Sequence, residues 1–181
     1  LLVLCTLLVT WGGYLINDLY DVETDKNNKP QKLLIGRDIS ASRVRIFYLF
    51  SVLLSFILAG HLAILYHKLQ WLWIHPLAVI ALWWYSKQLK GTVLWGNLLV
   101  SLFCAGVPLL VAFAEMESIQ EVHFDVRLRF TLYFYAAFAG ISNKVREIVK
   151  DAEDLDGDAS AGLNTLPVVQ GLKARKRWAL F

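Results

Sequence analysis

Asn17-Asp18-Leu19-Tyr20-Asp21-Val22-Glu23-Thr24-Asp25 closes the first apolar run of the chain with three regularly spaced aspartates. The same spacing, D-x-x-D-x-x-x-D, returns in Lys150-Asp151-Ala152-Glu153-Asp154-Leu155-Asp156-Gly157-Asp158. Positions i, i+3 and i+7 share one face of a helix, so each motif can direct three carboxylates at one point. Because each motif ends a hydrophobic segment, the pattern predicts six carboxylates near a membrane boundary.

Carboxylates gathered at this density need cations, because an unpaired carboxylate beside an apolar membrane segment is costly. Hard oxygen ligands in this number, with room for an anionic partner, favour Mg²⁺ that bridges to phosphates. The predicted catalytic residues and metal ligands are Asp18, Asp21, Asp25, Asp151, Asp154 and Asp158. Glu153 and Asp156 fall off the shared face, and we expect both to be solvated. The plain alternative for each motif is a solvated loop that follows a membrane helix.

The composition of the whole chain is that of a helical membrane protein. Of its 181 residues, 57% are hydrophobic, and the mean hydropathy is +0.49. Charged residues make up 18%, below the roughly 25% of soluble domains, and they gather between long apolar stretches. Cys5 and Cys104 lie inside apolar runs, so we expect two small buried side chains rather than a disulfide or metal site. The predicted fold class is all-α, a multi-pass bundle of transmembrane helices.

Five apolar segments are expected to enter the membrane: residues 1–15, 46–66, 71–85, 92–114 and 128–142. Two of them, 46–66 and 92–114, reach the length of a full span, about 20 residues. Segment 71–85 is shorter and rich in tryptophan, a residue that anchors helix ends at the membrane interface. Between residues 26 and 45 we expect a polar, basic loop.

Both ends of the chain lie within apolar sequence. Leu1 begins inside a hydrophobic run, the only methionine is Met116, and residues 177–181 resemble the start of a further apolar segment. We therefore expect residues 1–181 to form a single membrane-embedded domain that is an internal fragment of a longer protein, incomplete at both ends.

Lysine and arginine are distributed unevenly between alternate loops. Loops 21–45, 86–91 and 143–177 hold 15 of the 18 basic residues, whereas loops 66–70 and 115–129 hold the other three. Alternate loops lie on alternate sides of the membrane, and the positive-inside rule puts the basic side in the cytoplasm. Both aspartate motifs fall on that side. We expect an integral, multi-pass membrane protein, in the inner membrane if bacterial, with its active-site side cytoplasmic.

Basic residues near the motifs are candidates for contacts with a diphosphate held between two similar metal-binding half-sites. Lys90 is favoured because the glycine-containing stretch 91–97 loosens the backbone beside it, and Arg146 and Lys150 flank the second motif. The four histidines lack ligand spacing, so we expect them in packing or interface roles. Asn97 is expected in a hydrogen bond between buried helices.

These motifs resemble those of the UbiA superfamily of intramembrane prenyltransferases. The matches to the family's N-D-x-x-D-x-x-x-D are Asn17, Asp18, Asp21 and Asp25. Residues 85–97 resemble its Y-S-x-x-L-K…G-N stretch, and residues 146–167 resemble its R-E-x-x-K-D-x-E-D-x-x-G-D-x-x-x-G-x-x-T-L-P motif. The second motif is most similar to the branch that makes archaeal-type ether lipids, the geranylgeranylglycerol-phosphate geranylgeranyltransferases. Leu33 departs from the family pattern, in which many members have proline after a basic residue.

The resemblance implies a helical bundle around a central cavity, and transfer of a prenyl group from a prenyl diphosphate to a lipophilic acceptor with Mg²⁺ as cofactor. The residues then expected to bind the diphosphate are Asn17, Lys90, Arg146 and Lys150. Tyr20 and Tyr85 could stabilise an allylic cation through their ring faces, with anchoring or packing as the alternative. The expected partners are the prenyl diphosphate, the acceptor (geranylgeranylglycerol phosphate on this branch) and the lipid bilayer, with no nucleic acid.

Three alternatives stay open from sequence alone. The acceptor could be a quinone precursor, a chlorin or a haem, which other members of the superfamily prenylate. A soluble isoprenyl diphosphate synthase also pairs aspartate-rich motifs, but apolar runs of this length argue against it. A membrane cation transporter could line a path with carboxylates, although it would normally have them near the middle of the bilayer.

Overall fold

A computed structural model of the chain describes residues 1–28, 30–31, 33–114 and 126–171. Within those ranges the chain forms helices joined by turns, together with one isolated β-bridge between Ile35 and Ile39. The all-α prediction is confirmed. Contacts divide the chain into two compact units, Leu1–Lys90 and Gly91–Phe181. The acidic loop at 115–125 and the basic residues at 173–177, both used in the charge count, lie outside the described residues.

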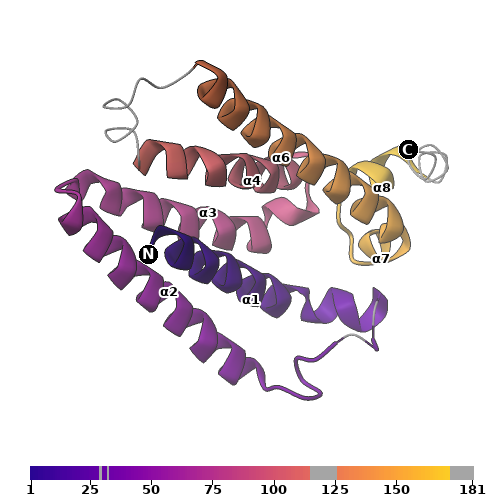
Figure 1. Cartoon of the computed structure of the whole chain (residues 1–181). Helices are drawn as coiled ribbons and strands as arrows, with labels where there is room; N and C mark the ends of the chain where they lie inside the picture. The colour runs from indigo at the N-terminus through magenta and orange to yellow at the C-terminus, as the bar shows by residue number, and fades with distance from the viewer. Residues whose placement is uncertain (29, 32, 115–125, 172–181) are drawn as a thin grey trace. The chain divides into compact units, whose positions relative to one another are not determined.

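The first unit contains three long helices that pack against one another (Figure 1). α1 covers Leu2–Asn28, α2 covers Ala41–Leu65 and α3 covers Ile74–Lys87. Two short 3-10 turns, η1 (Leu69–Trp73) and η2 (Leu89–Gly91), flank α3. The hydroxyl of Ser40 caps the start of α2 by accepting a hydrogen bond from the backbone nitrogen of Arg43 (3.4 Å).

α1 is longer, and the loop after it shorter, than predicted. The whole first aspartate motif lies within α1, and α2 already begins at Ala41. The predicted loop 26–45 therefore has helix at both of its ends, and residues 29–40 connect the two helices. α1 continues this far because no proline or glycine interrupts the sequence between Tyr14 and Pro30, and the residue before a proline is disfavoured in a helix.

Polar side chains join the apolar helices of the first unit. Ser55 on α2 is hydrogen-bonded through its hydroxyl to Nε2 of His75 on α3 (2.8 Å). The thiol of Cys5 on α1 donates to the backbone oxygen of Ser55 (3.3 Å). All three residues are buried. Such bonds stabilise helix contacts where the surrounding lipid is as apolar as the side chains. Cys5 is buried as expected, whereas Cys104 is only half-buried. Nδ1 of His75 is buried without a hydrogen-bond partner among the described atoms.

The second unit pairs two long helices and ends in two short ones. α4 covers Trp95–Ala114 and packs against α6, which covers Val126–Glu153 (Figure 1). α7 (Leu155–Ser160) and α8 (Leu166–Gln170) follow. A Cβ at Gly140 would lie 3.1 Å from Cβ of Ala105 and 3.3 Å from the backbone oxygen of Ser101. Small residues at such a contact let two membrane helices approach closely.

Replacing Gly140 with leucine is expected to force α4 and α6 apart, because a backbone oxygen cannot move aside as a flexible side chain can. The expected cost is about 1–3 kcal/mol in the free energy of unfolding, measured in detergent. Gly106→Leu on α4 is the matched control, since a Cβ there meets no described atom within 4 Å. An equal loss of stability in both variants would contradict a tight contact at Gly140.

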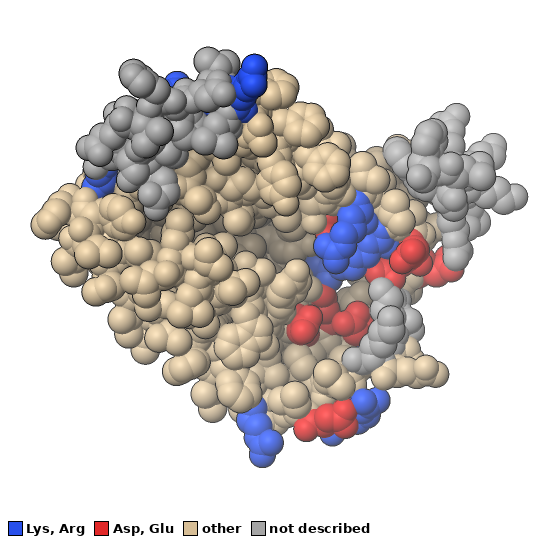
Figure 2. Space-filling view, in the orientation of Figure 1, with Lys and Arg blue, Asp and Glu red and all other residues tan. Residues whose placement is uncertain are grey.

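Three of the described helices are long and apolar enough to cross a membrane: Leu2–Lys26, Ala41–Leu65 and Trp95–Ala114. Only 17%, 17% and 11% of the residues in their apolar windows are buried, so most of their apolar side chains face outward, as contact with lipid requires. Most of the face drawn in Figure 2 is free of charge, and the charged residues gather in separate clusters. The chain is an integral membrane protein.

Two predicted membrane segments do not meet the same criterion. α3 has 14 residues, fewer than the roughly 20 that a full span needs. α6 has 28 residues, but charged residues occupy both of its ends and leave only its middle apolar. The alternation of sides that was derived from the loop charges depends on these segments, so the cytoplasmic position of the motifs stays a prediction.

Candidate active site

The first aspartate motif lies on a continuous helical surface. Asp18, Asp21 and Asp25 all belong to α1, so their spacing puts them along one face of that helix. Asp18 is exposed, Asp25 is half-buried, and Asp21 is buried, with 9% of its surface exposed. Asp21 is therefore the member whose charge most needs compensation within the protein.

Two side chains stabilise the buried carboxylate of Asp21. The amide nitrogen of Asn17, one turn earlier on α1, donates to Oδ2 (2.6 Å). The ammonium of Lys90, at the end of the first unit, forms an ion pair with the same oxygen. The structure thus brings together a predicted metal ligand and two predicted diphosphate ligands. Oδ1 of Asn17 is buried without a hydrogen-bond partner among the described atoms, which leaves a neutral oxygen ligand beside the carboxylate.

The second aspartate motif does not lie on one regular helix, contrary to the expectation from its spacing. Asp151 belongs to α6, Asp158 belongs to α7, and Asp154 lies between the two helices with φ −92° and ψ 11°. The backbone nitrogen of Asp158 still donates to the oxygen of Asp154 (2.9 Å). The chain therefore turns at Asp154 without losing its local hydrogen bonding.

Side chains from elsewhere in the second unit hold two of these aspartates. The amide nitrogen of Asn97, in the first turn of α4, donates to Oδ2 of Asp151 (2.8 Å). The hydroxyl of Thr165, just before α8, donates to Oδ2 of Asp158 (3.1 Å). Asn97 and Thr165 are 3% and 2% exposed, and Asp158 is 8% exposed. These buried contacts fix the orientation of both carboxylates.

Burial raises the pKa of the Asp151 carboxyl to about 6. The hydrogen bond from Asn97 and the charge of Lys150 lower this pKa, whereas the neighbouring carboxylates of Asp158 and Glu147 raise it further. A bound cation would keep Asp151 ionised, because it would offset both the desolvation and the nearby negative charges.

The other predicted residues have less direct positions. The side chain of Arg146 is 68% exposed, and its guanidinium lies 3.5 Å from Oε1 of Glu147. Lys150 is half-buried. Tyr20 is 42% exposed and, at 3.6 residues per turn, points about 100° away from Asp21 around α1. Tyr85 is half-buried. The roles of these four residues stay predictions.

Sequence reasoning did not assign Asn97, Thr165 or Glu147 to the site. The predicted bond of Asn97 between helices exists, and its partner is a motif aspartate. Thr165 begins the Thr-Leu-Pro stretch after the second motif, which could have indicated it. Glu147 is a carboxylate with 7% exposure, and its position four residues before Asp151 puts both on the same side of α6.

The donor chemistry of both motifs fits Mg²⁺. Carboxylates and a buried amide oxygen are the hard ligands that this ion prefers. In the described part of the chain, no three His, Cys, Asp or Glu side chains converge as a ready-made metal site. Mg²⁺ does not require one, because it is commonly held by one or two carboxylates, water and substrate phosphates. Asp21 in the first unit and Asp151 and Asp158 in the second could each supply a carboxylate to it.

An integral membrane protein with aspartate motifs near the ends of two helices is the class that this fold and this site define. A family model described as the UbiA prenyltransferase family matches residues 1–181. The chain belongs to that family.

Curated relatives named digeranylgeranylglyceryl phosphate synthase are similar to most of the chain. The protein from Sulfurisphaera tokodaii is 35% identical over 176 residues, which cover 94% of this chain and 56% of the relative. The protein from Methanopyrus kandleri is 34% identical over 164 residues, which cover 91% of this chain and 55% of the relative. The protein from Ignicoccus hospitalis is 35% identical over 176 residues, which cover 95% of this chain and 54% of the relative. The chain thus spans about half the length of the relatives that it matches. No solved structure was found to match it.

Proposed function

We propose that the protein transfers a prenyl group from a prenyl diphosphate to a lipophilic acceptor in the membrane, and that this acceptor is geranylgeranylglycerol phosphate. The observation that carries the proposal is the cluster of Asn17, Asp21 and Lys90 near the end of a membrane helix, since it offers ligands for both a metal ion and a phosphate. Membership of the UbiA prenyltransferase family supports the reaction, and the names of the relatives support the acceptor.

In this proposal the two units form one prenyltransferase domain, and both aspartate motifs lie on the cytoplasmic side. The aspartates of both motifs would hold Mg²⁺, which when bound withdraws negative charge from the diphosphate as the allylic C–O bond breaks. The oxygen of Asn17 has the hard donor chemistry to join them.

The cationic side chains have a second part in the reaction. Lys90 can exchange the carboxylate of Asp21 for a phosphate oxygen, since both are anionic and its side chain is long and flexible. Arg146 and Lys150 would add fixed positive charge where the leaving diphosphate gains negative charge. The apolar side chains of the helices, together with the rings of Tyr20 and Tyr85, would shield the allylic carbon from water until the acceptor attacks.

The test is a transfer assay on the protein, expressed from its complete reading frame and reconstituted in liposomes. Geranylgeranyl diphosphate and Mg²⁺ are supplied with either geranylgeranylglycerol phosphate or 4-hydroxybenzoate, and the products are identified by mass spectrometry. We expect prenylation of the glycerol phosphate, and we expect chelation with EDTA to abolish it.

The other outcomes separate the alternatives. Transfer only to the aromatic ring would overturn the acceptor but keep the reaction. No transfer to either acceptor, together with no Mg²⁺-dependent binding of the diphosphate, would overturn the whole proposal. A carboxylate-lined cation transporter would then be the remaining reading of the motifs.

A further inference from the structure

A cavity of 940 Å³ lies in the first unit, between α1, α2 and the loop that joins them. Its apolar lining includes Ile16, Leu19, Leu33, Ile35 and Leu49. Leu19 and Glu23 both line it, and each lies two positions from Asp21 along α1. At 3.6 residues per turn, they point about 160° away from that aspartate. None of the three motif aspartates lines the cavity, although Tyr20 and Val22, on either side of Asp21, do.

The lining of this cavity carries net positive charge. Three of its lining residues are cations, Lys26 at the end of α1, Arg37 in the loop and Arg45 in the first turns of α2, against one lining carboxylate, Glu23. The apolar run of α2 begins at Ile46, directly after Arg45. Cationic and apolar residues thus line one cavity where a membrane helix starts, which suits a ligand with an anionic head and a hydrocarbon tail.

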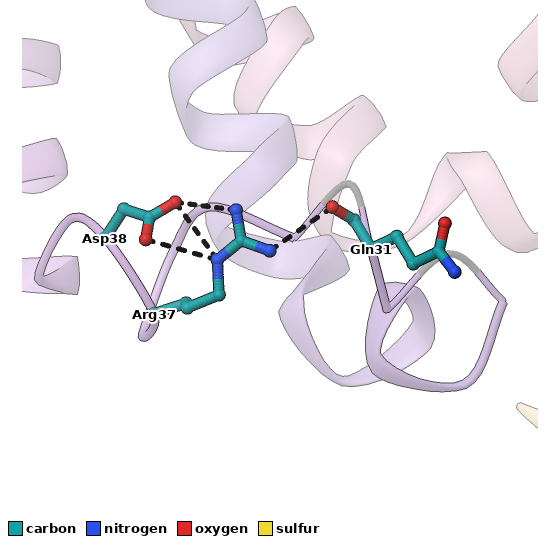
Figure 3. A network of polar contacts seen from close by, with 3 residues as sticks. All are labelled: Gln31, Arg37 and Asp38. Carbon is teal, nitrogen blue, oxygen red and sulfur yellow. Dashed lines mark hydrogen bonds and ion pairs between the residues drawn. The ribbon is translucent and has the colours of Figure 1, made fainter.

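The three cations differ in what already engages them. Lys26 forms an ion pair with Glu23 (2.6 Å). Arg37 makes a forked contact with Asp38 (2.7 Å at its shortest) and donates to the backbone oxygen of Gln31 (3.3 Å), as Figure 3 shows. Arg45 is exposed, and with the rest of the described chain it forms neither a hydrogen bond nor an ion pair. Arg45 is thus the lining cation with the most donors available for a ligand.

The loop that lines one side of the cavity has a defined turn. The backbone nitrogen of Gly36 (φ 90°) donates to the oxygen of Ile39 (2.9 Å), and that of Asp38 donates to the oxygen of Leu34 (2.9 Å). Glycine tolerates this positive φ because it lacks a Cβ. The turn keeps Ile35 buried, 9% exposed, in the cavity lining. The side chain of Arg37 is held within this loop by Asp38 and Gln31, whereas Arg45 lines the cavity from α2.

We propose that this cavity binds one glycerophosphate lipid, with the lipid phosphate at Arg45 and Lys26 and a hydrocarbon chain along the apolar lining. Its volume falls within the range of about 300–1,000 Å³ that is usual for ligand pockets. Basic pockets between membrane helices bind lipid head groups by the same combination of charge and apolar surface. Two lipids have this chemistry, a bulk anionic phospholipid and the acceptor of the proposed reaction. The inference rests on the cavity and not on that reaction.

The test measures lipids bound to the detergent-purified protein by native mass spectrometry. Phosphatidylglycerol, phosphatidylcholine and geranylgeranylglycerol phosphate are titrated separately. Arg45→Gln is expected to weaken binding of the phosphatidylglycerol about fivefold, the effect of one cation near an anionic lipid surface. Arg43→Gln is the matched control, because Arg43 is also exposed near the start of α2 but does not line the cavity. Ala41→Phe, which fills part of the cavity, is expected to weaken binding while both cations remain.

The outcomes decide both the site and the source of the lipid. Weaker lipid binding in Arg45→Gln and Ala41→Phe but not in Arg43→Gln supports the proposal. Whichever of phosphatidylglycerol and geranylgeranylglycerol phosphate binds more tightly identifies the source of the lipid. Glycerol 3-phosphate is expected not to compete with the lipid for binding, because it has no hydrocarbon tail. Effective competition would contradict the proposal that the ligand is an amphiphile. Equal losses of lipid binding in Arg43→Gln and Arg45→Gln would contradict a defined site and would indicate binding to a diffuse positive surface. If lipid binding fails while prenyl transfer persists, this inference fails and the proposed function stands.

Discussion

Asparagine in place of Asp21 is expected to lower the rate of prenyl transfer by about 100-fold or more. The substitution keeps the size of the side chain and a hydrogen-bonding group next to Asn17, but it removes the buried negative charge. Asp21→Ala, which also removes the oxygen ligands, is expected to abolish transfer. Both variants should still insert into membranes, because the apolar part of α1 is unchanged. Initial rates in liposomes, normalised to the inserted protein, measure the effect.

A double variant separates a loss of stability from a loss of catalysis. Asp21→Asn leaves the ammonium of Lys90 without its counter-ion in a setting where that side chain is only 27% exposed, so part of any loss could be instability. Lys90→Met removes the unpaired charge, and the double variant is expected to recover stability in detergent without recovering transfer. Recovery of transfer in the double variant would mean that Asp21 serves only to neutralise Lys90, and it would contradict a metal-binding role.

The first half of the site shows how far sequence reasoning reaches. The spacing of Asp18, Asp21 and Asp25 predicts one helical face because helix periodicity is a local property, and α1 confirms it. Lys90 follows Asp21 by 69 residues, and its ion pair depends on how α3 and η2 return the chain to α1. The glycine-containing stretch after Lys90 favoured it as a phosphate ligand, but nothing in the sequence indicated that Asp21 is its partner. Burial of one aspartate among three likewise depends on packing.

The second half shows where periodicity fails. Spacing i, i+3 and i+7 gives a common face only on an uninterrupted helix, and the chain turns at Asp154. The following Leu155-Asp156-Gly157 contains two poor helix formers, which is a local reason for the break. The residues that orient the carboxylates, Asn97 and Thr165, come from other elements of the second unit, and helix periodicity does not link them to the aspartates. Three of the five predicted apolar segments are helices long and apolar enough to cross a membrane, whereas the end of α1 and the start of α2 depended on a proline and a serine cap.

Asp158→Asn is expected to have an effect of the same size as Asp21→Asn, a loss of about 100-fold or more in transfer. Asp158 is 8% exposed and accepts a hydrogen bond from Thr165, so its charge is held in a fixed direction. Thr165→Val keeps the shape of the side chain and removes only the hydroxyl. The rate of transfer is expected to fall about tenfold in that variant, because the carboxylate of Asp158 remains but is free to rotate. Asp156→Asn, on the same short helix but exposed, is the matched control and is expected to leave the rate unchanged.

The dependence of these rates on Mg²⁺ distinguishes a metal ligand from a merely structural aspartate. A ligand that is present but badly oriented weakens metal binding, so raised Mg²⁺ is expected to restore most of the rate of Thr165→Val. The same Mg²⁺ concentration cannot replace a missing ligand charge, so Asp158→Asn is expected to stay slow. If raised Mg²⁺ restores neither variant and both unfold more easily in detergent, Asp158 stabilises the start of α8 through Thr165 and is not a metal ligand. Equal losses in Asp156→Asn and Asp158→Asn would instead mean that the total acidity of α7 matters, and not the buried position that the Thr165 contact defines.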